Sequence, residues 1–217
     1  MKVILTGATG YVGEGVLLAM LAQERIEKIL SIGRRPCGHT HAKLEEYIVP
    51  DLLTIQPGDP RLEGYDVCFF IAGITSVGTA IDTYRVISHD IPVHLAKILP
   101  NKEKMTFIYL SGAGTSSKGR QQWQKIKSLT ELETQQMGFA HAFGWRPMFM
   151  RPFPGQTNRQ LRAQKAALVL YPLCRLFGCA CSMPEMVNAM YHVATNGFHK
   201  PNLEAWDIIR CAKCNKL

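Results

Sequence analysis

The chain has 217 residues, and its 25 Lys and Arg against 17 Asp and Glu give a net charge of +8 at pH 7. Hydrophobic residues make up 47% of it, so it has enough apolar material for a substantial core, which excludes a disordered chain. The basic residues are scattered and no nucleic-acid-binding motif is present, so the charge does not predict a nucleic-acid partner.

Strand and helix signals alternate along the whole chain. The predicted strands are Val3–Leu5, Lys28–Ile32, Tyr47–Val49, Val67–Ala72, Thr106–Leu110, His141–Trp145 and Trp206–Arg210. The predicted helices are Tyr11–Gln23, Thr79–Leu99, Gln121–Met137, Leu161–Arg175 and Pro184–Asn196, the last with a capping box formed by Ser182 and Glu185. Such alternation is typical of a parallel sheet covered by helices on both faces.

These elements predict one doubly wound α/β domain over residues 1–217. We expect a mostly parallel sheet of about seven strands in the order 3-2-1-4-5-6-7, because crossovers between parallel strands are right-handed. Residues from about 148 to 205 then form a small segment on the substrate side. In this fold ligands bind outside the carboxyl ends of the strands, which directs attention to the loops that follow them.

The loop after the first strand has the spacing G-x-x-G-x-x-G. Gly7 permits a tight turn, Gly10 lets phosphates approach the backbone, and Gly13 lets the following helix pack on the strand. The exposed N–H groups at the start of that helix favour a dinucleotide pyrophosphate. The predicted phosphate-binding residues are Gly7, Thr9, Gly10, Tyr11, Val12 and Gly13.

Two arginines, Arg34 and Arg35, follow the second strand, where an acidic residue would bind the ribose hydroxyls of NAD. Guanidinium groups instead favour the 2′-phosphate of NADP. The sequence therefore predicts NADP in preference to NAD, although a solvated pair of arginines is the alternative. Asp51 and Leu52, after the third strand, are weaker candidates for contact with the adenine.

The chain resembles the short-chain dehydrogenase/reductase superfamily, in its atypical, NAD-dependent epimerase/dehydratase-like branch, over nearly its whole length. The resemblance rests on the glycine loop and four further motifs: T-G-A-T-G-Y-V-G (6–13), F-I-A-G-I-T-S (70–76), Y-L-S-G-A-G-T-S-S (109–117), W-x-x-x-K (123–127) and W-R-P (145–147). It implies a Rossmann fold and further cofactor contacts. These are expected from Ala72, Gly73, Ile74, Lys127, Pro147 and Phe149.

Catalysis in this superfamily uses a Ser after the fifth strand and a Tyr-x-x-x-Lys on the next helix. Ser111 matches the Ser, and Lys127 matches the Lys that binds the nicotinamide ribose, but Trp123 stands where the Tyr is usual. A phenol can be tuned to exchange a proton near neutral pH, whereas an indole N–H only donates a hydrogen bond. The resemblance thus implies a site whose usual proton donor is missing.

Three interpretations of Trp123 stay open at this stage. Trp123 orients a substrate carbonyl while another group supplies the proton, with Tyr84 and Tyr109 as the main candidates. Alternatively, the protein binds NADP(H) without turnover, as NmrA-like redox sensors do, or the catalytic residues lie elsewhere. Of the enzymatic functions, an oxidoreductase or epimerase-like enzyme acting on a small carbonyl or alcohol fits best, because about 60 residues after the sixth strand leave little room for a large substrate lobe.

The remaining features of the sequence suggest no metal, no membrane span and no export. The cysteines lack the spacing of a zinc site. The apolar stretch 166–183 is broken by Pro172, Arg175 and Gly178, so we expect a buried helix and loop there, with contact to a membrane surface as the alternative. The first strand begins directly after Met1, which predicts a cytoplasmic protein. Both monomer and homodimer are compatible with the sequence.

Overall fold

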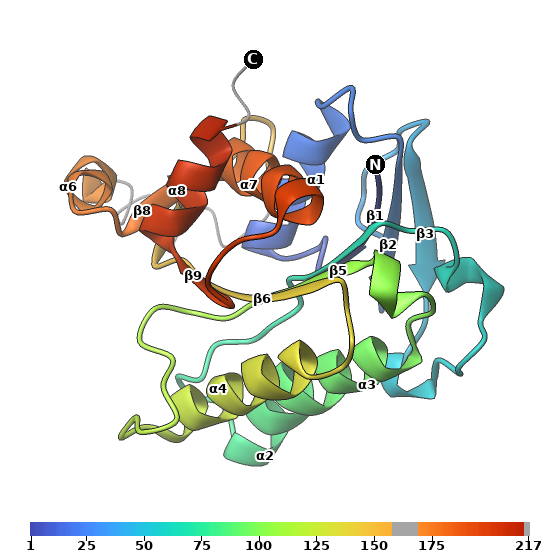
Figure 1. The fold of residues 1–217 in the computed structure, drawn as a ribbon, viewed down its shortest axis with the longest axis horizontal. Helices are drawn as coiled ribbons and strands as arrows, with labels where there is room; N and C mark the ends of the chain where they lie inside the picture. Colours follow the sequence, from blue (N-terminus) through green and yellow to red (C-terminus); the bar gives the residue numbers. More distant parts are fainter. Residues whose placement is uncertain (158–168, 215–217) are drawn as a thin grey trace.

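The computed structural model describes residues 1–157 and 169–214 of the chain. Its centre is a parallel sheet of seven strands in the order β3-β2-β1-β4-β5-β6-β9, which confirms the expected α/β fold and strand order (Figure 1). The strands are β1 (Lys2–Thr6), β2 (Lys28–Gly33), β3 (Leu44–Ile48), β4 (Val67–Phe70), β5 (Thr106–Leu110), β6 (His141–Arg146) and β9 (Asn202–Glu204).

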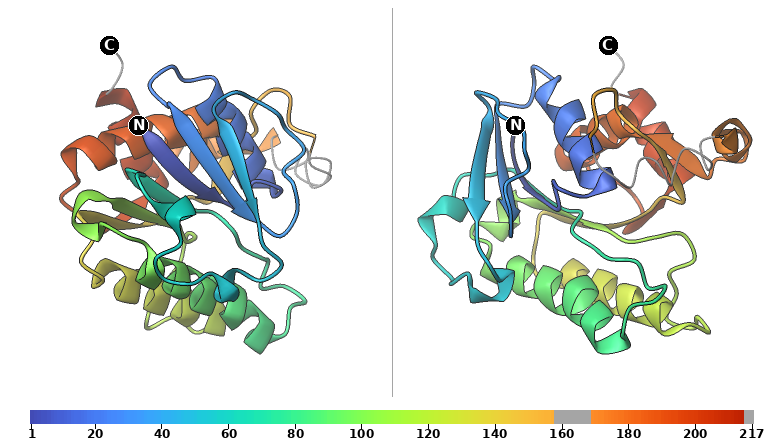
Figure 2. Two further views of the ribbon diagram at one scale, coloured as in Figure 1. Left: turned by 90° about the vertical axis from the view of Figure 1, so that its right-hand side faces the viewer. Right: turned by 180° about the vertical axis from the view of Figure 1, so that it is seen from behind.

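Helices cover both faces of this sheet, as the two further views in Figure 2 show. One face carries α1 (Tyr11–Leu21), α7 (Met183–Asn196) and α8 (Ala205–Cys214), and the other carries α2 (Ile81–Arg85), α3 (Ile91–Ile98) and α4 (Gln122–Gln135). Short 3₁₀ turns lie at Leu52–Thr54, Pro60–Leu62 and Lys102–Lys104. The central strands are buried on both faces, so all four residues of β4 are apolar and buried.

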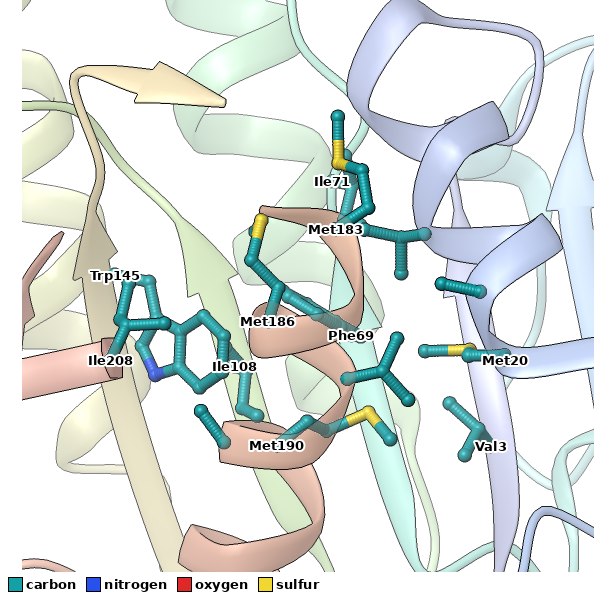
Figure 3. Packing of buried hydrophobic residues seen from close by; sticks show 14 of the residues in the cluster. Val3, Met20, Phe69, Ile71, Ile108, Trp145, Met183, Met186, Met190 and Ile208 are labelled. Carbon is teal, nitrogen blue, oxygen red and sulfur yellow. The ribbon is translucent and has the colours of Figure 1, made fainter. Parts of the chain in front are cut away.

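The larger of two apolar clusters lies between the sheet and the α1–α7–α8 layer. Figure 3 shows Met186 and Met190 of α7 beside Phe69 and Trp145 of the sheet, and Met183 at the Ile71 end of the cluster. The ring of Trp145 meets that of Phe69 edge to face, with 5.1 Å between centroids. α7 starts at the predicted capping box, since Ser182 Oγ accepts from the Glu185 N–H and the Glu185 carboxylate accepts from the Ser182 N–H.

Two predicted strands are corrected by the structure. The prediction of a strand at Trp206–Arg210 is wrong, because these residues lie in α8, whose buried Ala205, Ile208, Ile209 and Ala212 have helical spacing. The seventh strand is the three-residue β9 just before it. β3 begins at Leu44, three residues earlier than expected, since its pairing with β2 starts at Ile29.

The segment after β6 also differs from expectation. A second, two-stranded sheet joins β7 (Phe149–Arg151) to β8 (Ala180–Ser182), with α6 (Tyr171–Leu176) between them. The predicted helix Leu161–Arg175 falls largely on residues 158–168, outside the described residues. The expectation that the stretch 166–183 is buried is wrong for α6, because none of its residues is buried.

A π-helical turn at Val86–Asp90 joins α2 to α3 within the predicted helix Thr79–Leu99. Pro92 has no N–H to donate to the carbonyl of Ser88, four residues earlier. That carbonyl accepts instead from the Tyr109 hydroxyl of β5, at 2.7 Å, and from Thr130 Oγ1 of α4, at 2.9 Å. The Ser88 carbonyl thus connects the π-helical turn to β5 and to α4.

We expect Tyr109→Phe to lower the free energy of unfolding by about 1 kcal/mol, because the Ser88 carbonyl keeps Thr130 as a donor. Tyr109→Phe combined with Thr130→Val removes both side-chain donors from this carbonyl and is expected to cost more than the sum of the two single changes. Urea unfolding measures both. Tyr191→Phe is the control, because the Tyr191 hydroxyl makes no hydrogen bond to the described residues. Strict additivity would contradict the shared-acceptor explanation.

Candidate functional site

The predicted nucleotide loop is a turn in which two glycines leave no room for a side chain. Gly7 has a φ of +77°, and a Cβ there would lie 2.7 Å from the backbone nitrogen of Ala72. A Cβ on Gly13 would lie 1.9 Å from the carbonyl oxygen of Gly7. Gly10 is the N-cap residue of α1, and no side chain of the described residues caps this helix. The N-terminus of α1 is thus without a side-chain cap among the described residues, which suits it to an anion.

The Thr6 side chain fixes the neighbouring loop against this turn. Its buried Oγ1 accepts hydrogen bonds from the N–H groups of Ile71, at 3.0 Å, and Ala72, at 3.1 Å. Thr6 also pairs with Phe70 in the sheet register, so the loop that starts at Gly73 and Ile74 leaves the sheet beside the glycine turn. Both residues are exposed, and they are thus placed where a cover for the cofactor is predicted.

Arg34 and Arg35 lie on the opposite side of the glycine turn. Thr6, the last residue before the glycine turn, pairs with Ile32 of β2. Arg34 comes two residues after Ile32 and therefore lies near the start of the turn. Both arginines are exposed, and neither forms an ion pair within the described residues. Two free guanidinium groups beside a phosphate-binding turn fit a 2′-phosphate.

The two candidates after β3 have different environments. Asp51 is exposed, and its Oδ1 accepts from the N–H of Leu53 at 3.0 Å, so its carboxylate caps the short 3₁₀ turn. Leu52 is buried in the core cluster on the α3 side of the sheet. The contact of these two residues with adenine stays a prediction.

Ser111, directly after the end of β5, is buried, and its hydroxyl group contacts that of Thr115. Its Oγ lies 2.9 Å from Thr115 Oγ1, and Thr115 donates its only hydroxyl hydrogen to the carbonyl of Gly112 at 2.8 Å. Ser111 must therefore donate to Thr115 in this arrangement. The Ser111 N–H donates to the carbonyl of Trp145 at 2.7 Å, which holds the loop against the end of β6. Sequence reasoning missed the role of Thr115, although the motif S-G-A-G-T contains it.

Lys127 of α4 reaches the same loop. Its Nζ donates to the carbonyl of Leu110, the residue before Ser111, at 3.1 Å, and lies 5.2 Å from the centroid of the Tyr109 ring. Burial lowers the pKa of the Lys127 ammonium group to about 8, against a smaller opposite effect of the Glu131 carboxylate. The Lys127 ammonium group thus contacts the backbone next to Ser111, and a joint role for the two side chains stays a prediction.

Trp123 lies one turn before Lys127 on α4, on the side of the Ser111 loop. A Cβ on Gly114 would lie 3.8 Å from its ring, and its indole N–H donates to the side-chain oxygen of Gln121. The ring is partly exposed. The Trp123 ring therefore packs beside the loop that contains Gly114, and it supplies no group that can exchange a proton.

The two tyrosines proposed as proton donors lie in the interior. Tyr109 is fully buried, and its hydroxyl is committed to the Ser88 carbonyl, so the expectation that it reaches the pocket is wrong. Tyr84 is also buried, and burial raises its pKa against the opposing effect of Ser88. A catalytic role for Tyr84 stays a prediction. In that role Tyr84 would have to exchange a proton although its environment disfavours ionisation of the phenol.

Tyr11 links the glycine turn to the segment after β6. Its hydroxyl donates to the carbonyl of Met150 at 2.8 Å, and its own carbonyl accepts from Gln156 Nε2 at 2.7 Å. Burial raises the pKa of Tyr11 to about 12. The phenol is thus a structural anchor, and the backbone N–H of Tyr11 is the part of this residue that can face a ligand.

A depression of about 570 Å³ lies in the segment that Tyr11 anchors. Its lining includes Gln156, Phe153, Tyr171 and Arg151, whose guanidinium carbon lies 6.0 Å from the Tyr171 ring centroid. A space of this size suits a small molecule. Arg151 and Arg159 are both candidates for contact with an anionic substrate group, and Arg159 lies outside the described residues.

The other two predicted cofactor contacts follow β6. Pro147 is buried, and Phe149 begins β7, with its N–H donating to the carbonyl of Cys179 at 3.2 Å. Met148, between them, is exposed. Just before them, Arg146 forms two hydrogen bonds with the buried Glu131 of α4, at 2.9 and 2.5 Å. Arg146 therefore fixes α4, and with it Lys127, against the end of β6.

Glu14 is a further site residue that sequence reasoning missed. It lies buried in the first turn of α1 and accepts from the N–H and the hydroxyl of Thr157, both at 2.8 Å, while His39 Nε2 lies 3.1 Å away. A carboxylate in this turn is favoured by the helix dipole. Glu14 ties the segments around His39 and Thr157 to the glycine turn, and only the fold reveals these long-range partners.

Known proteins were compared with this chain. No family model matches it. It is 35% identical over 118 residues to leucinostatins biosynthesis cluster protein T of Purpureocillium lilacinum, which covers 52% of this chain and 44% of that protein. It is 26% identical over 153 residues to protein fmp52-2, mitochondrial, of Aspergillus terreus, which covers 65% of this chain and 63% of that protein. The chain thus spans less than two thirds of the length of these relatives.

Solved structures with the same fold cover nearly the whole chain. A UDP-N-acetylglucosamine 4-epimerase from Methanobrevibacter ruminantium M1 matches with a TM-score of 0.64 and 15% identity, over 93% of this chain and 74% of that one. Carbonyl reductase Sniffer of D. melanogaster matches with a TM-score of 0.61 and 12% identity, over 94% and 96%. The chain has the short-chain dehydrogenase/reductase fold.

This fold is the one that the resemblance drawn from the motifs implies. Within residues 1–157 and 169–214, no three His, Cys, Asp or Glu side chains are grouped so that they would hold a metal ion, and the cysteines are free. In that same part of the chain no helix is long and apolar enough to cross a bilayer.

The shifted pKa of Lys127 predicts a pH effect on stability. The unfolded lysine titrates near 10.5 and the folded one near 8, so between these values the unfolded state binds more protons and stability rises with pH. We therefore expect the unfolding free energy of the wild type, relative to that of Lys127→Met, to increase from pH 8 to about pH 10. Denaturant unfolding measures it. Lys125→Met, at an exposed position of α4, is the control and should show no such trend.

Proposed function

We propose that the protein binds NADP(H) and catalyses an oxidoreductase or epimerase-like reaction on a small carbonyl or alcohol. The observation that carries the proposal is the glycine turn, where neither Gly7 nor Gly13 can accept a Cβ and the N-terminus of α1 has no side-chain cap among the described residues. Such a turn is built for close approach of a pyrophosphate. The chain's own residues therefore fit a dinucleotide.

The preference for NADP rests on Arg34 and Arg35. Two exposed guanidinium groups without an ion-pair partner in the described part of the chain favour a doubly charged phosphate over ribose hydroxyls. Relatives and neighbours do not decide between the coenzymes, since a structurally similar chain, MoeE5, was solved with NAD. The exposed loop at Gly73 and Ile74 would cover the bound coenzyme.

The proposed chemistry uses Ser111 and Lys127. When bound, NADPH supplies a hydride at its nicotinamide C4. Ser111 orients the substrate oxygen by turning its hydroxyl away from Thr115, and Lys127 holds the nicotinamide ribose with the N–H groups that the Leu110 carbonyl leaves free. With a pKa of about 8, Lys127 also carries a proton that it can release close to neutral pH.

A second candidate is an NADP(H)-binding sensor or regulatory module without turnover. The observation in its favour is the lack of an available phenol beside Lys127, because an indole occupies position 123 and the Tyr109 hydroxyl is committed to Ser88. The position of Lys127 at the Leu110 carbonyl, next to Ser111, favours the enzyme instead. The two candidates differ in one measurable property, turnover.

The test is NADPH binding by fluorescence, followed by NADPH consumption with a panel of aldehydes and ketones. For the enzyme we expect turnover that Ser111→Ala and Lys127→Ala each lower about a hundredfold or more, while Lys125→Ala has no effect. We expect Trp123→Tyr to raise the rate, because it restores a phenol one turn before Lys127. Tight binding without turnover, in the wild type and in Trp123→Tyr alike, would establish the sensor.

Compartment and assembly also stay proposals. The sequence predicts a cytoplasmic protein, whereas relatives such as fmp52-2 carry the word mitochondrial in their names. Monomer and homodimer both agree with the structure. We also propose that residues of about 148–205, with the depression beside Arg151, form the substrate side of the site.

A further inference from the structure

Six large apolar side chains are more than half exposed on one side of the molecule. We call them the α6 surface; they are Val169, Leu170, Leu173, Leu176, Phe177 and Trp206, with exposed fractions between 52% and 79%. Leu173 and Leu176 are three residues apart in α6, so their side chains share one face of that helix. Folded monomers rarely leave a contiguous apolar surface of this kind in water unless it meets a partner.

Helix α6 stands out from the body of the protein (Figures 1 and 2). It is held by polar contacts, since Arg175 donates to the carbonyl of Ala180 and forms an ion pair with Glu185 of α7. The two leucine side chains of α6 are exposed and thus do not attach it to the core. Arg175 thus attaches α6 to the body of the protein, while Leu173 and Leu176 face solvent.

A basic stripe on α8 continues the α6 surface. Trp206 lies against Gly178, where a Cβ would be 2.9 Å from its ring, so it joins α8 to the end of the α6 segment. Arg210 and Lys213 follow Trp206 at i+4 and i+7, and all three are exposed. No carboxylate among the described residues pairs with either cation.

We propose that the α6 surface and the Trp206–Arg210–Lys213 stripe dock onto an anionic lipid bilayer. Apolar side chains next to a tryptophan and cations match the boundary between acyl chains and negative headgroups. A second copy of the chain fits less well, because the same surface would face itself across a two-fold interface, and it offers no carboxylate to pair with Arg210 and Lys213. The net charge of +8 adds attraction to a negative surface.

The test is co-sedimentation of the full chain with vesicles of phosphatidylcholine alone or of equal parts phosphatidylcholine and phosphatidylserine. We expect association with the anionic vesicles and a blue shift of tryptophan fluorescence that Trp206→Phe removes. The pair Leu176→Ser and Phe177→Ser should abolish association. The pair Arg210→Glu and Lys213→Glu should weaken it about tenfold or more, since each cation contributes about 1 kcal/mol near an anionic surface.

Matched changes elsewhere provide the controls. Leu129→Ser with Leu132→Ser removes exposed apolar side chains from α4, and Lys104→Glu with Lys125→Glu makes the same change in charge far from the stripe. Neither pair should alter association by more than about twofold. NADPH binding and thermal melting show that each variant is folded. Wild-type protein that stays in solution with anionic vesicles would overturn the proposal, as would equal losses from both charge pairs or self-association that the Leu176 and Phe177 changes abolish.

Discussion

Gly13→Ala is expected to abolish detectable NADPH binding and to lower the free energy of unfolding by about 3 kcal/mol, or Tm by roughly 10 °C. The added Cβ would lie 1.9 Å from the Gly7 carbonyl oxygen and 2.5 Å from its carbonyl carbon. Both are backbone atoms, so the methyl group can be accommodated only if α1 moves away from the turn. That movement displaces the N–H groups that the proposed pyrophosphate needs.

Gly112→Ala is the matched control, because a Cβ there meets nothing within 4 Å and the residue has no positive φ. It should melt within about 2 °C of the wild type and keep its NADPH affinity. Thermal melting and fluorescence titration measure the two effects. A Gly13→Ala variant that binds NADPH like the wild type would remove the glycine turn from the proposed site.

The second large effect is expected from Arg34→Ser combined with Arg35→Ser. We expect NADPH affinity to fall about tenfold to a hundredfold while NADH affinity changes little, because charge-assisted hydrogen bonds to the 2′-phosphate are lost. Both side chains are exposed, so their removal leaves no cavity and should not change Tm. Fluorescence titration with both coenzymes gives the ratio of affinities.

The control for the arginines is Lys104→Ser combined with Lys125→Ser, which lowers the net charge by the same amount at exposed positions. It should leave the ratio of the two affinities unchanged. Equal weakening of NADPH and NADH by the arginine changes would indicate a general electrostatic effect and contradict recognition of the 2′-phosphate.

The glycine turn and the sheet order were predictable from the sequence because they depend on local features. Buried parallel strands appear as continuous apolar runs, and the three glycines directly follow the first of them. The approach of Lys127 to the end of β5 was predictable from spacing, since the end of β5 and the next helix are adjacent in this fold. The error at Trp206–Arg210 came from two adjacent isoleucines, which were interpreted as a strand although the wider spacing is helical.

Contacts between distant segments were not predictable. The burial of Tyr109, the partners of Glu14 and the link from Tyr11 to Met150 each join residues between 21 and 143 positions apart. A single sequence carries no signal for such pairs, because the residue type is the same whether a polar side chain faces water or a buried acceptor. The outward direction of the α6 side chains is of the same kind, since apolar residues at helical spacing usually face a core.

The sequence by itself thus determined the order of the strands, the position of the glycine turn and the absence of a tyrosine one helical turn before Lys127. Periodicity, glycine stereochemistry and side-chain chemistry act within a few residues, so they are legible in a linear chain. Only the tertiary structure decided which hydroxyls are free for chemistry, which way α6 faces and how far burial lowers the pKa of Lys127. Hydrogen-bond partners and desolvation depend on neighbours that the fold brings together from distant parts of the chain.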